Sequence, residues 1–339
     1  MRFLFLVKTN LVQNISFDTI VERIRLVCNQ KRWDYELVYT SFFGEEEEVV
    51  RSFLNEIPER PIRVIVCGNF ESLHFAVNGL AEAKDVELGY FPCDGNYDFF
   101  SAFPKIPTSK ITNIEDLLNG QTVDLDLVKI NNRYCITVAY IGMDTNLSWF
   151  SFQLLRFCRW CSFFRFNQQL FRRWFNFCIL LFDTHPKTIR LCVNGYAMFE
   201  NPYTVVAFAN TRKYGTGTVC APLAKIDDGL VDLVYVRKLT LRPFLRMTGI
   251  YWKGLIAENE FARNFLEYRR CMNIHVETPE PVFMAMDTTI YLHDQQFHIQ
   301  PIPAALRLLI PTENEQEKKQ ENENKQENKN EQKNEQEIK

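Results

Sequence analysis

Short apolar runs alternate with amphipathic stretches along residues 1–110. Apolar runs of this length predict buried strands, and apolar side chains at helical spacing predict the helices between them. The predicted strands are 3–7, 35–39, 63–67 and 86–91, and the predicted helices are 16–29, 45–55 and 72–83. Strands that alternate with helices are typical of a parallel sheet with helical crossovers. The pattern therefore predicts an α/β domain with a parallel sheet over residues 1–118.

From residue 124 onward the pattern changes to closely spaced β-rich runs with few helices between them. These runs are 134–140, 189–193, 204–209, 230–236, 272–277, 296–299 and 305–310. Two stretches with helical periodicity interrupt them, 148–182 and 242–265. Because strands without crossover helices pair with their neighbours in antiparallel fashion, we expect a β-rich, antiparallel, sandwich-like second domain over residues 119–311, with 148–182 as a helical insert.

The last stretch, residues 312–339, consists almost entirely of Glu, Asn, Gln and Lys. Such a segment has too little apolar surface to bury, so we expect a disordered charged tail. Its nine Glu and six Lys account for the whole formal net charge of −3. The rest of the chain is balanced in charge, which gives no reason to expect a nucleic-acid partner.

The ten cysteines occur mostly within apolar runs, as buried thiols do in a reducing compartment. Cys158 and Cys161 form a Cys-x-x-Cys pair, but no second pair matches it, so a metal or redox site is not favoured. The apolar run at 3–7 is too short for a signal peptide. No window of about 20 apolar residues predicts a membrane span. The sequence therefore predicts a cytoplasmic protein.

The most specific motif runs from Tyr214 to Asp232. It holds a Tyr-Gly-x-Gly loop, then Pro-x-Ala at 222–224 and Asp-Asp-Gly-Leu-x-Asp at 227–232. This order resembles the diacylglycerol kinase catalytic-domain family of lipid kinases, which is related to sphingosine kinases and NAD kinases. The resemblance implies a Mg²⁺ site formed by the carbonyls of Lys225 and Leu230 and the carboxylate of Asp228, all oxygen ligands of the kind Mg²⁺ prefers. The alternative is a plain Asp-Gly turn between two strands.

Three further stretches extend the resemblance over residues 1–311. The sequence at 140–144 resembles the family's Gly-Ile-Gly-Phe-Asp, 125–127 resembles its Ile-Asp-Leu, and 301–311 resembles its closing strand. Met-Asp-Thr-Thr at 286–289 stands where the family has Asp-Gly-Glu. The resemblance implies that Asp287 is the general base on the lipid hydroxyl, although Thr289 replaces the Glu of that motif.

The nucleotide-binding motif of the family is only partly kept. Its Gly-Gly-Asp-Gly-Thr loop is replaced by Gly68-Asn69-Phe70-Glu71-Ser72, although glycines let backbone N–H groups approach phosphate oxygens. Glu71 would repel a triphosphate, at a cost on the order of 4 kcal/mol for unit charges about 4 Å apart. The nucleotide-binding residues that the resemblance implies are Thr40, Gly68, Asn69, Ser72, Gly95 and Asp98.

Two functions follow from the resemblance. The first is the transfer of the γ-phosphate of ATP, with Mg²⁺, to the hydroxyl of diacylglycerol or a similar lipid alcohol. The second is a catalytically impaired member that keeps the fold as a lipid- or partner-binding module. The altered loop favours the second, because phosphoryl transfer depends on positioning and charge neutralisation. The retained Thr40, Asp98, Asp228 and Asp287 favour continued ligand binding, so the kinase activity is the primary prediction. Since the family's β-rich domain often pairs, the resemblance also implies a homodimer.

The stretch from Trp149 to Phe182 combines many aromatic side chains with five arginines and no acidic residue. Aromatic and arginine residues at a helical period suit a helix that lies on an anionic membrane surface. The expected lipid or membrane contacts are Trp160, Arg172, Arg173 and Trp174. The alternative is a helical hairpin that packs on the second domain with its arginine stems directed outward. The first interpretation predicts a peripheral protein at the inner face of the membrane.

Overall fold

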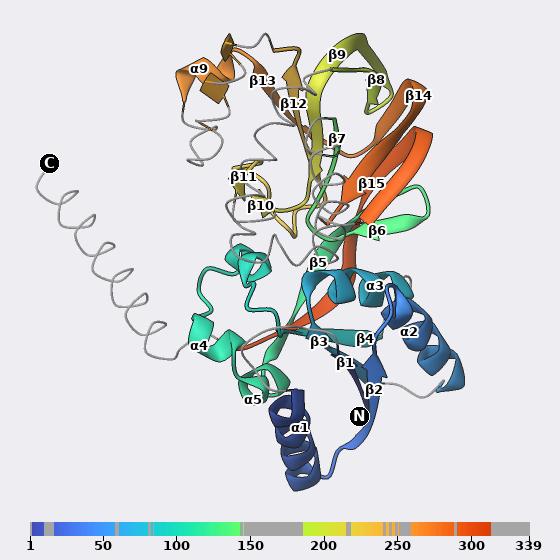
Figure 1. The fold of residues 1–339 in the computed structure, drawn as a ribbon, viewed down its shortest axis with the longest axis vertical. Helices are drawn as coiled ribbons and strands as arrows, with labels where there is room; N and C mark the ends of the chain where they lie inside the picture. The colour runs from blue at the N-terminus through green and yellow to red at the C-terminus, as the bar shows by residue number, and fades with distance from the viewer. Residues whose placement is uncertain are drawn as a thin grey trace, which may run out of the picture.

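The computed structural model describes the chain in segments that form an α/β half and a β-rich half (Figure 1). The described residues are 2–9, 17–57, 61–80, 83, 85–142, 145, 186–214, 218–239, 242–243, 246–247, 250, 259–287 and 290–312. The predicted insert at 148–182 and the predicted tail beyond Thr312 lie outside them. In Figure 1 the α/β half lies below the β-rich half.

Four strands of the N-terminal half form a sheet in the order β2-β1-β3-β4. All neighbours in this order pair in parallel. The strands are β1 (Arg2–Lys8), β2 (Asp34–Thr40), β3 (Ile62–Gly68) and β4 (Val86–Pro92), and the helices between them are α1 (Phe17–Lys31), α2 (Glu45–Glu56) and α3 (Phe70–Leu80). Each element lies within a few residues of its predicted range, because apolar periodicity is a strong signal in elements of this length.

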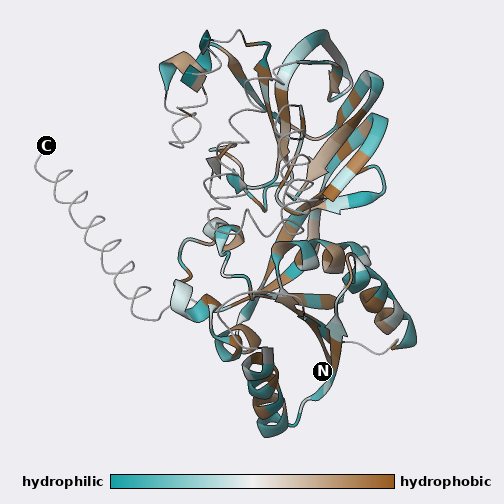
Figure 2. Ribbon diagram, in the orientation of Figure 1, coloured by the Kyte–Doolittle hydropathy of each residue, from teal (hydrophilic) through white to brown (hydrophobic). Residues whose placement is uncertain are grey.

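Side chains of this sheet point alternately to two faces, and helices cover both. Phe3, Phe5 and Val7 pack with α1 and with α5 (Ile114–Leu118). Leu4 and Leu6 pack instead with α2 and α3. Because successive side chains of a strand point to opposite faces, a sheet buried on both faces needs nearly continuous apolar strands. Figure 2 shows these strands largely in the colour of hydrophobic residues.

Residues 98–118 form short helices that the apolar pattern does not predict. They are the 3₁₀ helix η1 (Asp98–Ala102), α4 (Thr108–Ile111) and α5. Four or five residues are too few to display a helical period. A local signal is present at α5, where the Asn113 side chain accepts a hydrogen bond from the N–H of Glu115 at 3.0 Å, as capping asparagines do.

The second half consists mainly of strands that pair in antiparallel fashion, so the prediction of a β-rich antiparallel second half is confirmed. Its strands are β5 (Gln121–Ile130), β6 (Arg133–Cys135), β7 (Val138–Gly142), β8 (Lys187–Val193), β9 (Tyr196–Ala209), β10 (Lys213–Tyr214), β11 (Thr218–Val219), β12 (Val231–Arg237), β13 (Leu266–Cys271), β14 (Ile274–Met286) and β15 (Ile290–Ile310). A short helix, α9 (Glu260–Arg263), precedes β13.

Several strands of the second half enclose its largest apolar cluster. β9 and β14 each pair with β8 along one part of their length and with β7 along another. The side chains enclosed in this way include Ile189, Leu191, Phe208, Leu233 and Phe297, all without exposed surface. Phe75, from α3 of the other half, packs into the same core. The two halves therefore share apolar contacts through α3.

The prediction of two separate strands at 296–299 and 305–310 is wrong, because the structure has a single long strand, β15. β15 first pairs with β14 and ends by pairing in parallel with β4. Its pairing with β5 shifts register between Ile302 and Leu306, where Pro303 cannot donate a ladder hydrogen bond. The strand thus runs through both halves and joins them in one hydrogen-bonded sheet (Figure 1).

Asp126 in β5 stabilises the place where β15 crosses between the halves. Its side chain is buried, its Oδ1 accepts the N–H of Ala304 at 2.9 Å, and its Oδ2 accepts the N–H of Gly229 at 2.6 Å. Asn210 Nδ2 donates to the Asp126 carbonyl at 2.8 Å. A buried carboxylate needs such donors. Asp126 therefore holds in place the backbone at Gly229 and at Ala304, which are far apart in the sequence.

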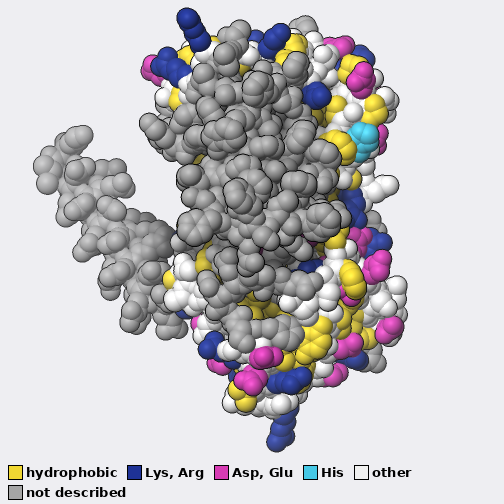
Figure 3. Space-filling view, viewed as in Figure 1, with side chains coloured by type: hydrophobic (Ala, Val, Ile, Leu, Met, Phe, Trp, Pro, Cys, Tyr) yellow, Lys and Arg dark blue, Asp and Glu magenta, His cyan; other side chains and the backbone are white. Residues whose placement is uncertain are grey.

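The described surface shows no dominant charge on the face drawn in Figure 3. Acidic and basic side chains are interspersed there, as the balanced charge outside the tail leads one to expect. None of the helices within the described ranges has the length and apolar character required to cross a membrane.

We expect Asp126→Ala to lower the free energy of unfolding by about 2–4 kcal/mol, because two backbone N–H groups lose their partner in a buried site. Urea denaturation followed by circular dichroism measures this. Asp124→Ala is the control, since Asp124 lies on the same strand with a side chain that is 64% exposed. Equal losses for the two variants would contradict a structural role of the buried carboxylate.

Candidate functional site

Several predicted site residues meet at the edge where the parallel strands end. β1 ends at Lys8, β2 at Thr40 and β3 at Gly68, and α/β sheets bind ligands at this carboxyl edge. Asn69 and Ser72 follow Gly68 at the start of α3. Of the residues predicted to bind a nucleotide, the structure therefore brings Thr40, Gly68, Asn69 and Ser72 together.

A buried glutamate that the sequence analysis did not single out lies at the centre of this edge. Glu46, in the first turn of α2, is 1% exposed. Its Oε1 accepts hydrogen bonds from Lys8 Nζ at 2.8 Å, Thr40 Oγ1 at 2.8 Å and Ser72 Oγ at 2.9 Å. Lys8 and Ser72 are 38 and 26 residues away along the chain, so no local spacing marks the cluster. In the sequence, the feature that could have indicated this cluster is Lys8, a charged residue at the end of an apolar strand.

The start of α3 differs from the prediction and removes the loop expected there. The helix begins at Phe70 rather than at Ser72, and Asn69 caps it by accepting from the N–H of Ser72 at 3.0 Å. The Asn69 Oδ1 also lies 3.0 Å from the Ser72 hydroxyl, whose single proton is directed to Glu46 Oε1. A capping side chain of this kind stabilises a helix from its first turn. The Phe70 ring packs near Phe99, with ring centroids 5.6 Å apart. Residues 69–71 therefore form a capped helix terminus in place of a glycine-rich loop.

Gly68 is needed where β3 passes into α3. A Cβ atom at this position would lie 2.8 Å from Cβ of Ser72, which is closer than side-chain atoms approach one another. The glycine thus allows the end of the strand and the first turn of the helix to come into contact.

Gly95 and Asp98 lie in the turn after β4, beside the second half. Gly95 has a φ of 75°, and the N–H groups of Asn96 and Asp98 donate to the side chains of Asp94 and Asn96, both at 3.0 Å. Burial raises the pKa of Asp98, the nearby Lys213 ammonium partly lowers it, and the Asp94 carboxylate raises it further. Lys213 belongs to β10, so Asp98 faces a cation from the other half.

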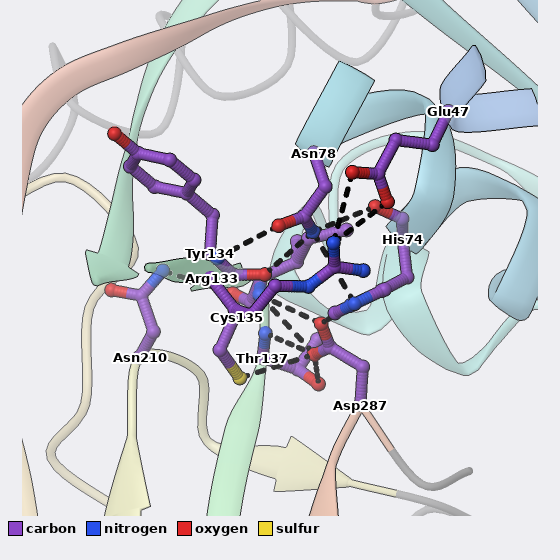
Figure 4. Close-up of polar contacts among 10 residues, drawn as sticks. Glu47, His74, Asn78, Arg133, Tyr134, Cys135, Thr137, Asn210 and Asp287 are labelled. Atoms are coloured by element: carbon purple, nitrogen blue, oxygen red, sulfur yellow. Dashed lines mark hydrogen bonds and ion pairs between the residues drawn. The ribbon is translucent and has the colours of Figure 1, made fainter. Parts of the chain in front are cut away.

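Asp287, the predicted general base, is fully buried and surrounded by donors (Figure 4). Its Oδ1 accepts the N–H and the Oγ1 of Thr137, both at 2.8 Å, and its Oδ2 accepts the N–H of Ile136 at 3.0 Å. His74 Nδ1 lies 2.7 Å from Oδ2, and Cys135 Sγ donates to Oδ1 at 3.4 Å. Asp287 itself has a φ of 47°. The carboxylate holds α3 against the backbone between β6 and β7.

The electrostatic surroundings of Asp287 oppose a role as a base. Burial alone would raise its pKa, but the hydrogen bond and charge of His74 together with the N–H groups of Ile136 and Thr137 outweigh burial, so the pKa is lowered. A carboxylate with a lowered pKa and no exposed surface takes up a proton poorly. Its catalytic role stays a prediction, and it would require this network to open.

The same network continues through α3 to the second half. Asn78 Nδ2 donates to the Tyr134 carbonyl at 2.9 Å, and Asn78 Oδ1 accepts the N–H of Tyr134 at 2.9 Å. Asn78 Nδ2 also lies 3.2 Å from His74 Nε2. On the outer side, Arg133 contacts both carboxylate oxygens of Glu47 at 2.9 and 2.8 Å. Figure 4 shows the contacts of Asn78 with Tyr134 and His74, and beside them the separate pair of Arg133 and Glu47.

Asp228, the one side chain among the residues predicted to bind Mg²⁺ (Lys225, Asp228 and Leu230), pairs with a guanidinium group. Asp228 Oδ2 pairs with Arg270, and its Oδ1 accepts the N–H of Leu230 at 3.2 Å. Arg270 also lies 3.4 Å from the buried Asp232 carboxylate. A second cation beside a guanidinium is repelled, so this donor set does not fit Mg²⁺. Across the described ranges, no group of three or more His, Cys, Asp and Glu side chains is placed to hold a metal ion.

The remaining predicted contacts lie outside the described residues. They are Trp160, Arg172, Arg173 and Trp174. Their role at a lipid or membrane surface stays a prediction.

We expect Asp287→Asn to lower the free energy of unfolding by about 3–5 kcal/mol at neutral pH, because it leaves buried donors without a charged acceptor. Since the folded pKa lies below the usual 3.8, this contribution is present above the unfolded pKa and is lost as the pH falls through the lower folded pKa. The difference in the free energy of unfolding between the wild type and the variant should therefore become smaller at low pH. Asp294→Asn, on the exposed part of β15, is the control in urea melts at pH 7 and pH 3.

We expect the melting temperature of the wild type to be insensitive to Mg²⁺ and EDTA. Arg270→Ala should lower it by about 3–6 °C and make it rise on addition of millimolar Mg²⁺, because Asp228 and Asp232 are then left without their cation. Arg269→Ala is the matched control, as Arg269 is half-exposed on the same strand. Strong stabilisation of the wild type by Mg²⁺ would show that the guanidinium does not replace a metal.

Comparison with known proteins agrees with the features of both halves. A family model described as the YegS C-terminal NAD kinase beta sandwich-like domain matches residues 178–310. The diacylglycerol kinase of Mycobacterium tuberculosis (strain H37Rv) is 26% identical over 255 residues, which cover 73% of this chain and 76% of that protein. The diacylglycerol kinase of Staphylococcus carnosus is 26% identical over 180 residues, 52% of this chain and 55% of that protein.

Solved structures share the fold over nearly the whole chain. A diacylglycerol kinase from Bacillus anthracis str. Sterne superposes with a TM-score of 0.64 and 16% identity, covering 93% of this chain and 97% of that one. A second structure from the same organism has a TM-score of 0.70 at the same identity and coverage. The chain is therefore similar in sequence to proteins named diacylglycerol kinase, its residues 178–310 match the YegS C-terminal domain, and it shares the fold of the solved structures.

Proposed function

We propose that this protein is a lipid kinase that transfers the γ-phosphate of ATP to the hydroxyl of diacylglycerol or a similar lipid alcohol. The names of its relatives support the class of reaction. The observation that carries the proposal to this chain is the polar cluster at the carboxyl edge of the parallel sheet, where Thr40, Ser72 and Lys8 converge. That edge is where this class of sheet binds its ligands.

The chain's own residues supply the positioning and charge that phosphoryl transfer needs. We propose that Thr40, Gly68, Asn69 and Ser72 line the phosphate end of the nucleotide site, with Gly95 and Asp98 on its other side. Lys213 reaches Asp98 from the second half, so a ligand between the halves would contact both. Because the Asp228 cluster does not fit Mg²⁺ in this geometry, no step of the reaction is assigned to a metal there.

Asp287 has a different role in this proposal from the one that the family resemblance implies. Its five donors hold it in the interior, so we propose that it positions His74 and the backbone at 136–137 rather than accepting a proton from the lipid. The lipid alcohol is proposed to enter between the halves. The aromatic and arginine segment from Trp149 to Phe182 is proposed to meet an anionic membrane surface from the cytoplasmic side.

A second candidate is a catalytically impaired member that binds a lipid or a protein partner. The specific observation in its favour is the start of α3, where the Asn69 cap takes the N–H of Ser72 that a phosphate loop would offer to a ligand. The buried Asp287 favours it as well, since its lowered pKa makes this carboxylate a poor acceptor of a proton.

A transfer assay with radiolabelled ATP and a mixed lipid extract separates the two candidates. We expect the wild type to label a lipid and Asp98→Asn to reduce labelling at least about tenfold, as loss of one positioning group commonly does. Asp85→Asn is the control, because Asp85 is exposed at the opposite end of β4. Lipid binding without any labelled product, with or without Mg²⁺, would overturn the kinase proposal in favour of the binding module.

A further inference from the structure

We propose that Lys8, Thr40 and Ser72 form a binding site for a nucleotide phosphate group, and that the Glu46 carboxylate occupies this site as an internal substitute for the phosphate. The proposal rests on the assignment of the carboxyl edge as the nucleotide site. It adds Lys8 as a phosphate-binding residue and Glu46 as the group that a nucleotide must displace.

The hydrogen-bond geometry shows three donors that converge on one anionic oxygen. The ammonium of Lys8 and the hydroxyl groups of Thr40 and Ser72 all lie within 2.9 Å of Glu46 Oε1. They come from the ends of β1 and β2 and from the first turn of α3. Phosphate oxygens accept the same kind of charge-assisted hydrogen bond that this carboxylate oxygen accepts. Three donors gathered from separate segments therefore define an anion site, whichever anion fills it.

The burial of the pair shows that the site lies inside the molecule rather than on a charged surface. The side chains of Lys8 and Glu46 are 9% and 1% exposed. Burying charges is costly unless they are paired, so Lys8 needs an anion at this place. In the structure Glu46 provides it, and Lys8 Nζ also donates to the Phe42 carbonyl at 2.7 Å.

Glu46 is an imperfect occupant of the site. Its second oxygen, Oε2, is buried and has no hydrogen-bond partner among the described residues. Native structures rarely leave a buried carboxylate oxygen without a partner. The side chain therefore gives up part of its hydration without full compensation, which lowers the cost of replacing it by another anion.

The occupied site accounts for the loss of the glycine-rich loop. In such a loop, backbone N–H groups neutralise the phosphates, whereas here the first turn of α3 is capped by Asn69. In this chain the Lys8 ammonium would supply the positive charge that neutralises the phosphate. With Glu46 in place the net charge of the cluster is zero, and a phosphate at contact distance from the carboxylate is repelled. Rotation of the Glu46 side chain away from the cluster leaves Lys8, Thr40 and Ser72 available to a ligand.

The test compares anion binding by the full-length wild type, Glu46→Ala and Glu46→Gln, with inorganic pyrophosphate and with ATP as probes. Isothermal titration calorimetry and thermal shift in metal-free buffer give the affinities. We expect Glu46→Ala to bind pyrophosphate at least about tenfold more tightly than the wild type, since a competing charge is removed, with Glu46→Gln in between. Glu48→Ala is the matched control, because Glu48 is an exposed glutamate on the same helix. Lys8→Met combined with Glu46→Ala should abolish the gain.

The outcomes separate this inference from the proposed function. A gain for pyrophosphate but none for ATP supports the anion site and counts against a nucleotide site at this edge. Equal affinities of the wild type, Glu46→Ala and Glu48→Ala for both pyrophosphate and ATP overturn the inference while leaving the kinase proposal in place. If both Glu46 variants unfold, the ion pair is required for the fold, no ligand can displace it, and the inference is overturned.

Discussion

Asp287 carries a charge in the interior of this protein, and the arrangement of the two halves depends on how that charge is satisfied. A carboxylate without exposed surface is tolerated only when donors surround it. Here the donors come from the backbone and side chains between β6 and β7 and from His74 of α3. The distance between α3 and the second half is thereby set by hydrogen bonds, whose length is defined much more narrowly than that of an apolar contact.

Helix α3 consequently packs against the apolar cores of both halves. Leu73, Ala76 and Val77 face the parallel sheet, while Phe75 packs into the core of the β-rich half. Asn78 extends the polar contact along the same helix by pairing with the backbone of Tyr134. A shift of α3 would therefore disturb the nucleotide edge at Ser72 and the interface at His74 together. Three acidic residues of the family-like motifs, Asp126, Asp228 and Asp287, are paired with protein donors in this chain.

The sequence pattern predicted the elements of the first half well because each of them is long enough to show its period. It failed for residues 98–118, where the helices are one turn long, and for β15, where two prolines interrupt a strand that continues in space. The site was predicted in part. The resemblance to the family implied Thr40 and Ser72, but Glu46 and Arg270 act on residues far away in the chain. Their roles depend on the tertiary fold, which local pattern does not contain.

The course of β15 has a consequence for how the chain reaches its folded state. Strand β4 receives its second parallel neighbour only from residues 307–309, near the end of the described chain. During synthesis the first half would emerge from the ribosome with one edge of its sheet still unpaired. An unpaired edge of this kind exposes backbone donors and acceptors that can join another chain. Pairings between residues so distant in sequence also form late, which slows folding. The strand that unites the two halves thus makes the sheet of the first half dependent on residues more than 200 positions further along the chain.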